Sequence, residues 1–318
     1  MIEIQTVAPS QDAPALERVA AHLLASGAGS EQPGDQIAEY VSNWAEYEQA
    51  RVLVAEESSN PVGWLGVVPW PGEYATLHWL RWGLPGWPTV IEAADEVEIG
   101  RKLLAAAEET IPSEVRAILC CIDRSIEVSA ERLSLLQDRY AQIGYQYAEA
   151  VHFIHETKRA ALPSAPEGLR VVPLREPSSE ELIACIRDVF SGDVAEFFCG
   201  GSVEEQEAFL RGLPKSSTMD EAASVALLEG SELVGFATAI GNRDNENLVL
   251  NWLGLRPAWR RRGYARFLLQ HTLAVAGDDG YRTASLSSQT QNAASMALYE
   301  NEGWDIEGGE HQFTKYVG

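Results

Sequence analysis

The apolar and polar positions of the chain form two similar series, separated by a stretch without periodicity. Within each series, short runs with the pattern of a strand alternate with longer runs that have the amphipathic period of a helix. The order is the same in both: a strand, two helices, three strands, a helix, a buried strand, a helix and a final strand pair. The matching runs are residues 2–7, 13–24, 36–47, 52–57, 62–70, 75–82, 98–109 and 117–123 in the first series, and 169–174, 180–190, 203–210, 224–230, 233–240, 248–255, 264–276 and 283–289 in the second.

This repetition predicts two domains built on one plan. The last helix of each series ends in a similar sequence, RYAQIGYQY or LYENEGWDI, with a tyrosine four residues before a glycine. Residues 157–168 lack periodicity and hold two prolines and a glycine, a composition typical of a linker. We therefore predict an α/β (mixed α+β) fold of two tandem domains, 1–158 and 168–318, joined by a linker at 159–167. Each domain is expected to have a mixed, mostly antiparallel sheet flanked by helices; two unrelated α+β domains are the alternative.

Charge and composition exclude several classes of function. The 318 residues include 24 basic and 47 acidic side chains, a net charge of −23, which repels nucleic acid and anionic lipid, so neither is an expected partner. The cysteines and histidines show no metal-binding spacing, and no metal is expected. The N-terminal residues do not have the pattern of a secretory signal, and no apolar stretch is long enough to span a membrane. We expect a cytoplasmic protein with reduced thiols.

Residues 253–270, LGLRPAWRRRGYARFLLQ, carry the clearest chemical signal. An apolar strand ends at Pro257, three consecutive arginines follow, and Gly263 opens an amphipathic helix. So many cations in one turn of an acidic protein repel one another unless an anion neutralises them. Gly263 and Ala265 leave room for backbone N–H groups to face a ligand at the positive end of the helix. A solvated basic loop is one interpretation; the strand, turn and helix together favour a phosphate or pyrophosphate site.

Two motifs in this half resemble those of the GNAT superfamily of N-acyltransferases. Leu255-x-Pro257 followed by Arg260-x-x-Gly263-x-Ala265 resembles the acyl-CoA pyrophosphate motif of the family. Downstream, the run from Asn292 to Trp304 (Asn-x-x-Ser-x-x-Leu-Tyr-x-x-x-Gly-Trp) resembles its later helix, with the Asn cap and the Leu-Tyr pair. The resemblance covers residues 168–318, and the two motifs lie in the order and separation of the family.

The resemblance implies acetyl-CoA as co-substrate, with no metal. Residues 250–255 would lie open on one side and pair with the pantetheine arm, with a backbone N–H near Leu255 facing the thioester oxygen. The turn 260–265 would take the pyrophosphate, and the arginine side chains the outer phosphates. The residues expected to bind the cofactor are Leu253, Gly254, Leu255, Arg260, Arg261, Arg262, Gly263, Tyr264, Ala265, Asn292 and Ser295.

Tyr299 is the expected proton donor to the leaving thiolate. It lies two helical turns after Asn292, so both project from one face of the helix. A buried core tyrosine is the alternative from position alone. The general base stays unassigned, because the strand before the turn has no carboxylate; Glu246 and Asp244, just before it, are candidates that an exposed loop would equally explain. The expected activity is transfer of an acetyl or other short acyl group to the primary amine of a small molecule or peptide. A non-catalytic acyl-CoA-binding or regulatory protein is the alternative.

The first half is expected to be a degenerate copy, a tandem layout similar to that of mycothiol synthase. Where the second half has its basic turn, the first has carboxylates at Glu92, Asp95, Glu96 and Glu98, which repel phosphate. We therefore predict one coenzyme per chain. Six aromatic residues are expected either to pack in the core or to form a wall of the acceptor pocket. They are Trp64, Trp70, Tyr74, Trp79, Trp82 and Trp87. The sequence does not indicate the oligomeric state.

Overall fold

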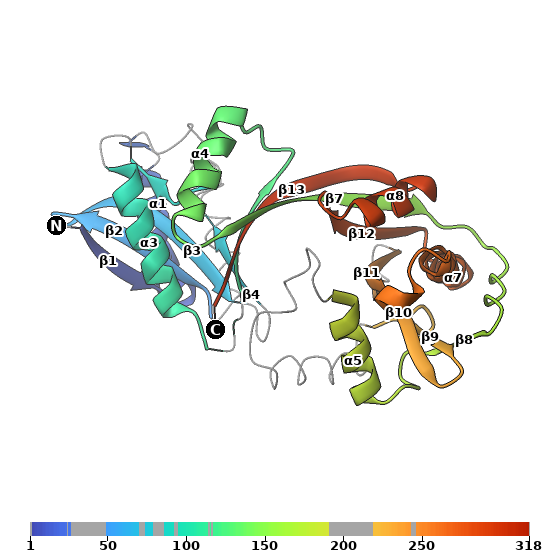
Figure 1. The fold of residues 1–318 in the computed structure, drawn as a ribbon. Coiled ribbons are helices and arrows are strands. Elements are labelled where there is room, and N and C mark those ends of the chain that lie inside the picture. Colours follow the sequence, from blue (N-terminus) through green and yellow to red (C-terminus); the bar gives the residue numbers. More distant parts are fainter. Residues whose placement is uncertain are drawn as a thin grey trace. The chain divides into compact units, whose positions relative to one another are not determined.

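The computed structural model describes residues 2–23, 25–26, 49–69, 74–78, 86–91, 95–113, 115, 117–190, 219–242 and 246–317 (Figure 1). The chain forms two compact units. Unit 1 comprises residues 1–148 and 310–318, and unit 2 comprises residues 149–309. The helices predicted at 36–47 and 203–210 lie outside the described residues, as do Glu92, Asp244, Cys199, Trp70, Trp79, Trp82 and the side chain of Tyr74.

Unit 1 is a sheet in the order β1-β2-β3-β4-β6-β13, in which only β4 and β6 are parallel neighbours. The short strand β5 pairs with β3. Three described helices, α1, α3 and α4, accompany the sheet (Figure 1). The elements are β1 (Ile2–Val7), α1 (Pro9–Leu23), β2 (Arg51–Glu57), β3 (Asn60–Pro69), β4 (Tyr74–His78), β5 (Thr89–Val90), α3 (Glu96–Thr110), β6 (Ala117–Asp123), α4 (Ala130–Ala141) and the later part of β13 (Asp305–Tyr316).

Unit 2 repeats this arrangement. Its sheet has the order β8-β9-β10-β11-β12-β7, and only β11 and β12 are parallel neighbours. The elements are β7 (Gln146–Glu156), β8 (Leu169–Pro173), α5 (Ser179–Phe190), β9 (Val225–Glu229), β10 (Glu232–Asn242), β11 (Asn247–Leu255), the 3₁₀ turn η4 (Pro257–Trp259), α7 (Tyr264–Asp278), β12 (Thr283–Gln289) and α8 (Ala293–Asn301).

The repetition extends to the register of the strands. In unit 1 the parallel pairing begins with Tyr74 beside Ala117, and in unit 2 with Asn247 beside Thr283. Because these residues occupy the same places in the two predicted series, the register gives a residue-by-residue correspondence between the units. The predicted mixed fold with mostly antiparallel sheets is confirmed.

The predicted final strand pair is wrong in both series. Each series ends in one long strand, β7 or β13, because alternation continues without a turn. Gly308 and Gly309, a pair that a turn would use, lie inside β13. The part of β7 from Ala150 to Glu156 pairs with β12 in unit 2, whereas the part of β13 from Glu310 to Tyr316 pairs with β6 in unit 1. Each sheet is therefore completed by a strand from the other half of the sequence, and the boundary at 159–167 stays a prediction.

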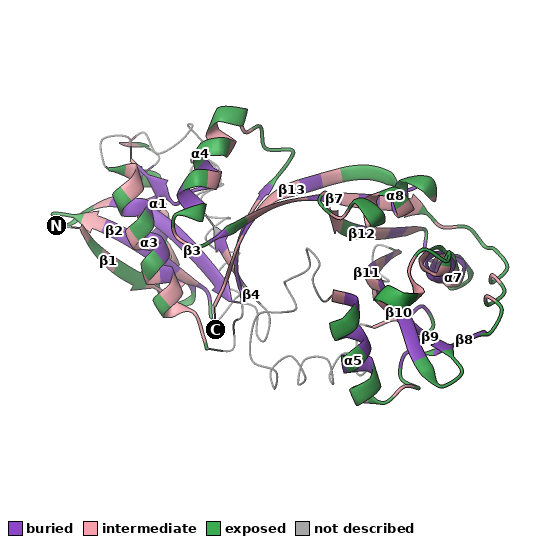
Figure 2. Cartoon of the chain, viewed as in Figure 1, coloured by how far each residue is buried: buried purple, intermediate pink, exposed green. Residues whose placement is uncertain are grey.

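Both sheets contain many buried residues (Figure 2), and buried apolar clusters lie on both faces of each sheet. In unit 1, α3 and α4 cover a core that includes Trp87, and α1 covers a smaller one that includes Trp64. Both tryptophans are almost fully buried, which supports core packing for the two aromatic residues of the predicted cluster whose side chains are described. In unit 2, α7 and α8 cover one face and α5 covers the other. Among the described residues, no helix combines the length and apolar character needed to cross a membrane.

Candidate acyl-CoA site

Strand β11 separates from its neighbour β12 half-way along its length. The two strands pair from Asn247 to Val249, opposite Thr283 to Ser285, and β11 then continues to Leu255 while β12 pairs on its other side with β7. Beyond Val249, the edge of β11 that faces away from β10 therefore has no strand partner among the described elements. An extended ligand can pair with such an edge as an added strand does.

The backbone N–H groups of Leu253 and Leu255 point to this open edge. Arg256 donates its backbone N–H to Val234 and Trp252 donates its own to the Thr238 hydroxyl, at 2.9 and 3.0 Å, so both point toward β10. Successive N–H groups of a strand point to opposite sides. Leu253 and Leu255 therefore offer hydrogen-bond donors to a ligand beside the strand, in the place expected for the thioester and pantetheine.

A bulge lies just before these donors. Thr238 of β10 pairs with Trp252, whereas Ala239 pairs with Leu250, so Asn251 is an extra residue on β11. A bulge bends its strand and increases its twist, which carries the end of β11 away from β12. The sequence shows apolar residues on both sides of Asn251 and no glycine or proline at the bulge, so it gives no signal for this feature.

The turn before α7 presents backbone N–H groups to solvent. Gly263 precedes α7 with φ +82°, and no side chain caps the helix. The first N–H groups of an uncapped helix have no partner in the helix and lie at the positive end of its dipole. Arg261 also has a positive φ, 64°, a conformation that costs a non-glycine residue about 1–2 kcal/mol. Strain of this kind is common where backbone is shaped for a ligand.

The five arginines of this region divide into two groups. Arg256 lies 3.3 Å from an Asp188 oxygen and 3.6 Å from a Glu232 oxygen, and Arg266 lies 2.5 Å from an oxygen of Glu302. Arg260 donates to two backbone carbonyls, those of Leu255 and Val189, at 3.1 and 2.7 Å.

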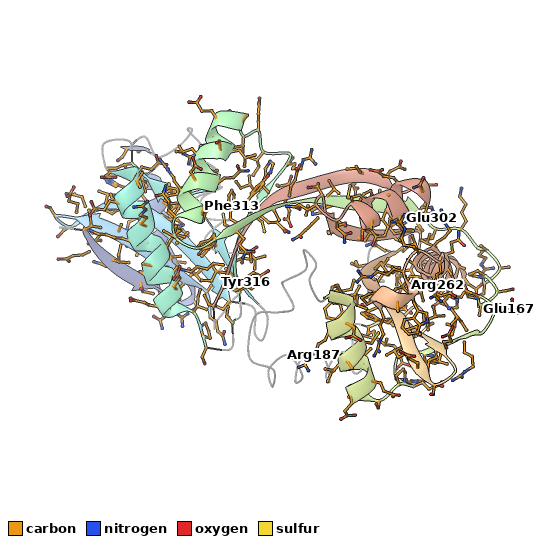
Figure 3. All side chains as sticks on the ribbon, in the orientation of Figure 1. Glu167, Arg187, Arg262, Glu302, Phe313 and Tyr316 are labelled. Carbon is orange, nitrogen blue, oxygen red and sulfur yellow. The ribbon has the colours of Figure 1, made fainter. Side chains whose placement is uncertain are left out.

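Arg261 and Arg262 are exposed and have no ion-pair partner among the described residues; Arg262 is labelled beside α7 in Figure 3. Three of the five arginines therefore have partners within the protein. Arg261 and Arg262 remain available to bind a ligand.

Helix α8 lies across from the basic turn and the open edge of β11 and completes the site. Asn292 caps it, accepting the Ser295 backbone N–H at 3.1 Å, as the motif predicts. Tyr299 lies one turn after Ser295 and is 7% exposed, packed against Phe153 and Trp304 with ring centroids 5.4 and 5.9 Å apart. Burial raises the pKa of Tyr299 to about 12, although a hydrogen bond from Ser295 opposes the shift. The phenol is therefore protonated at neutral pH, as a proton donor must be.

A cavity of about 410 Å³ lies between these elements. Apart from Arg262, every residue predicted to bind the cofactor lines it. Tyr299 does not line the cavity. Its hydroxyl is hydrogen-bonded to Ser295, and Ser295 lines the cavity. The sequence analysis missed the residues that reach the cavity from α5 and the sides of α7 and α8, because only the fold brings these helices together. They are Val189, Phe190, Arg266, Ala294 and Leu298.

The structure removes one candidate base. Glu246 immediately precedes β11, has a φ of 54° and forms an ion pair with Arg282 at 3.1 Å. It lies seven residues before Leu253, a span of about 23 Å in a strand, so it is too far from the Leu253 and Leu255 donors to act beside them. Asp244, the other candidate, is outside the described residues.

In unit 1 the start of α3, the helix that corresponds to α7, is capped by a side chain of its own. Asp95 caps α3 by accepting the N–H groups of Val97 and Glu98 at 3.2 and 3.0 Å. Its carboxylate therefore occupies the helix end that is open in unit 2. Glu96 faces inward and accepts from Arg139 at 2.7 Å and Arg132 at 3.2 Å. Of the described residues, no group of three or more His, Cys, Asp or Glu could hold a metal ion.

Residues 187–304 match the model of the acetyltransferase (GNAT) family. The match covers 118 of the 318 residues, which is less than half of the chain. Every residue that lines the cavity falls within it. The GNAT match thus covers the β11 edge, the basic turn and α8, while the remainder of the chain lies outside it.

Individual proteins extend this similarity. The mycothiol acetyltransferase of Jonesia denitrificans is 26% identical over 167 residues, 51% of each protein, so the chain matches about half the length of this relative. A GCN5-related N-acetyltransferase from Sphaerobacter thermophilus is similar in structure over 99% of this chain and 95% of its own, with 18% identity and a TM-score of 0.54. A glucosamine N-acetyltransferase region of a fungal multi-domain β-N-acetylglucosaminidase covers 99% of this chain and 38% of that one, with 11% identity and a TM-score of 0.54. At these identities the two solved structures show a shared fold across both units.

Proposed function

We propose that unit 2 binds acetyl-CoA and transfers its acetyl group to the primary amine of a small molecule or peptide. The observation that carries this proposal is the open edge of β11 at Leu253–Leu255, which ends beside the uncapped start of α7. An acyl-pantetheine arm fits the strand edge, and a pyrophosphate fits the helix end. The family of residues 187–304 supports the same chemistry.

The basic turn would bind the phosphates in two ways. The pyrophosphate would accept hydrogen bonds from backbone N–H groups at 263–265, where the helix dipole also favours an anion. Arg261 and Arg262 would serve the outer phosphates as mobile charges. Arg260 would contribute indirectly, by joining the end of β11 to α5 through its two backbone carbonyl partners.

The reacting groups would lie further along β11. An N–H of Leu253 or Leu255 would hydrogen-bond to the thioester oxygen and stabilise the negative charge that forms when the amine attacks, an effect worth about 3–4 kcal/mol per donor in other enzymes. As the C–S bond breaks, Tyr299 would protonate the departing sulfur. The Ser295 hydroxyl, which bonds Tyr299 and lines the cavity, would connect the buried phenol to the sulfur.

The relatives guide the choice of acceptor. The match to a mycothiol acetyltransferase, and the fold shared with a glucosamine N-acetyltransferase, favour a small-molecule amine over a protein N-terminus. The absence of a carboxylate from β11 favours the second candidate function, a non-catalytic acyl-CoA-binding protein.

Calorimetry and a thiol-release assay would separate these functions. Titration with acetyl-CoA should give one site per chain, since α3 is capped by its own Asp95. Thiol release should follow with at least one of glucosamine, an aminoglycoside and a peptide with a free N-terminus. Two equivalent sites would contradict the assignment to unit 2 alone. Stoichiometric binding without release of thiol would identify the non-catalytic protein.

A further inference from the structure

The proposed reaction needs a group that takes a proton from the amine, and none lies on β11. The adjoining strands carry one candidate. His152 on β7 lies directly opposite Ser287 on β12 in the antiparallel register of unit 2. Side chains so paired project from the same face of a sheet, with Cβ atoms about 5 Å apart. His152 is partly exposed, so its ring can exchange protons with solvent.

This pair lies next to the gap between β11 and β12. Ser285 is the last residue of β12 that pairs with β11, and Ser287 follows two residues later on the same face. Ser287 therefore borders the gap, about 7 Å beyond its starting point, and is exposed. His152 stands behind it on the next strand. A proton that leaves an amine in the gap can pass through the Ser287 hydroxyl to the imidazole.

Asn251 and Trp252 lie on this same face of β11. Trp252 packs with Phe190 and the rest of the α5 core, whereas its neighbours Leu250 and Leu253 pack in the α7 core on the other face. The face that holds His152 and Ser287 is thus the α5 face. A substrate amine that approaches the open part of β11 from this side would meet Ser287 across the gap.

The internal repeat provides a comparison within the chain. By the register that matches Ala117 to Thr283, Cys121 of β6 corresponds to Ser287, and its partner on β13 is Gln312. Unit 1, in which Asp95 caps the start of α3, therefore has Gln312 at the position that His152 occupies in unit 2. A glutamine accepts hydrogen bonds but does not take up a proton near neutral pH. The ionisable side chain is found in the unit with the cradle.

The nearest described neighbours of His152 on the adjoining strands, β12 and β13, are uncharged. On β12 the same face carries Ser285, Ser287 and Gln289, all uncharged. On β13, Gly308 is the near residue: a Cβ added there would lie 3.8 Å from His152 Nδ1.

Charged groups on this face lie further along the strands. Glu156 on β7 pairs with Thr283, four residues from His152. Glu310, two residues after Gly308, is engaged within unit 1, where it accepts from Gln312 at 2.5 Å and bonds Cys121.

We propose that His152, through Ser287, is the proton acceptor for the substrate amine; this inference rests on the proposed acetyltransferase function. The ammonium form of the substrate loses one proton through the Ser287 hydroxyl to His152, which passes it to solvent. The neutral amine then attacks the thioester carbon and forms the C–N bond. As the C–S bond breaks, the nitrogen loses its second proton and the thiolate gains one, so the products are the amide, the free thiol and one released proton.

The test compares His152→Gln with His155→Gln in the full chain. Both variants make the same change on β7, but His155 lies on the opposite face, in ring contact with Trp304 at 5.4 Å. Each is assayed for thiol release from pH 6 to 9.5 with the best aliphatic amine of the panel, and with an aromatic amine that is already neutral at pH 7. Acetyl-CoA binding is measured alongside.

We expect His152→Gln to lower kcat about 10²-fold with the aliphatic amine at pH 7. The loss should shrink as the pH rises toward the pKa of the amine, and the aromatic amine should react at nearly the wild-type rate. Ser287→Ala should give a smaller loss of the same kind, because water can replace the hydroxyl. His155→Gln should keep the wild-type pH profile.

Three results would overturn the inference. One is an active His152→Gln enzyme with the wild-type profile. Another is an equal loss with both amines, which would indicate a structural role. In both of these the wild-type enzyme is active, so the proposed function stands. Wild-type protein that binds acetyl-CoA but releases no thiol would instead refute the proposed function, and this inference with it.

Discussion

The Arg260 side chain donates from Nε to the carbonyl oxygen of Leu255 at 3.1 Å. A second bond from the same guanidinium, to the carbonyl of Val189 at 2.7 Å, ties the end of β11 to α5. The first arginine of the basic turn is thus a structural residue. Its two successors have no such partners among the described residues.

Because of this difference, we expect substitution of Arg260 to change the stability of the fold and substitution of Arg261 or Arg262 to change the affinity for acetyl-CoA. Arg260→Gln should lower the free energy of unfolding by about 2 kcal/mol, because hydrogen bonds to charged groups are worth about 1.5–3 kcal/mol each. For a domain of this size the Tm falls by about 4–8 °C. Arg261→Gln and Arg262→Gln should leave Tm unchanged and weaken acetyl-CoA binding up to about fivefold each, less at high salt. Thermal denaturation and calorimetry measure the two effects; a stable Arg260→Gln would contradict the structural role.

Gly263 and Gly280 form a matched pair at the two ends of α7. Both have a left-handed φ, +82° and +84°, and neither has a heavy atom within 4 Å of an added Cβ. Gly263→Asp and Gly280→Asp should therefore cost the same strain, about 1–2 kcal/mol. Only Gly263→Asp should also place a negative charge at the phosphate site and abolish measurable acetyl-CoA binding. Equal affinity in the two variants would remove the phosphate from this turn.

Tyr299→Phe should leave acetyl-CoA affinity nearly unchanged, since the ring packing is retained. Turnover should fall about ten- to a thousandfold if the hydroxyl donates the proton. Tyr140→Phe is the control, because Tyr140 occupies the matching sequence position in unit 1 and is also buried. Its hydroxyl bonds the Cys120 thiol, so its loss should affect stability alone. Full turnover of Tyr299→Phe on the physiological acceptor would make Tyr299 a core residue only.

Glu96 should make unit 1 sensitive to acid. Burial acts to raise its pKa, but the guanidiniums of Arg139 and Arg132 together hold the pKa below its ordinary value of 4.5. A carboxyl whose pKa is lower in the folded state stabilises the fold above its unfolded pKa, and the stabilisation is lost as the pH falls through the folded pKa. Glu96→Gln should cost about 1–3 kcal/mol at pH 7 and reduce the loss of stability below pH 4.5. Urea denaturation at pH 7 and pH 3.5 measures both; an unchanged pH dependence would contradict the pairing.

Local features of the site could be predicted from the sequence because they depend on a few neighbouring residues. Gly263 must precede α7 because its φ is left-handed, and Asn292 caps α8 with its own side chain. Both motifs could therefore be located in the sequence, and residues of both line one cavity in the structure; their role in binding acyl-CoA stays a prediction. The use of the arginines could not be predicted in the same way. Arg256 and Arg260 each have one partner on α5, Asp188 and Val189 respectively, and only the folded sheet brings that helix to the turn.

The pairing of the last strand of each series could not be predicted from the sequence either. Glycines 308 and 309 have the composition of a turn, yet they lie within a continuous strand whose later residues pair with β6. The pairing of β13 with β6 is decided by which sheet has an open edge, and alternation along one strand does not contain that information. The separation of β11 from β12 depends on a bulge at Asn251 that no local residue signals.

The exchange of β7 and β13 also sets an order on folding during synthesis. Unit 1 has most of its helices and strands in the first 148 residues, but β6, which pairs with β4 on one side, acquires its second partner only when residues 310–316 have left the ribosome. Until then β6 is a free sheet edge in a nascent chain, the kind of edge that recruits other extended segments. Proteolysis of ribosome-bound chains of increasing length should therefore find unit 1 protected last, after nearly all of unit 2 has been made.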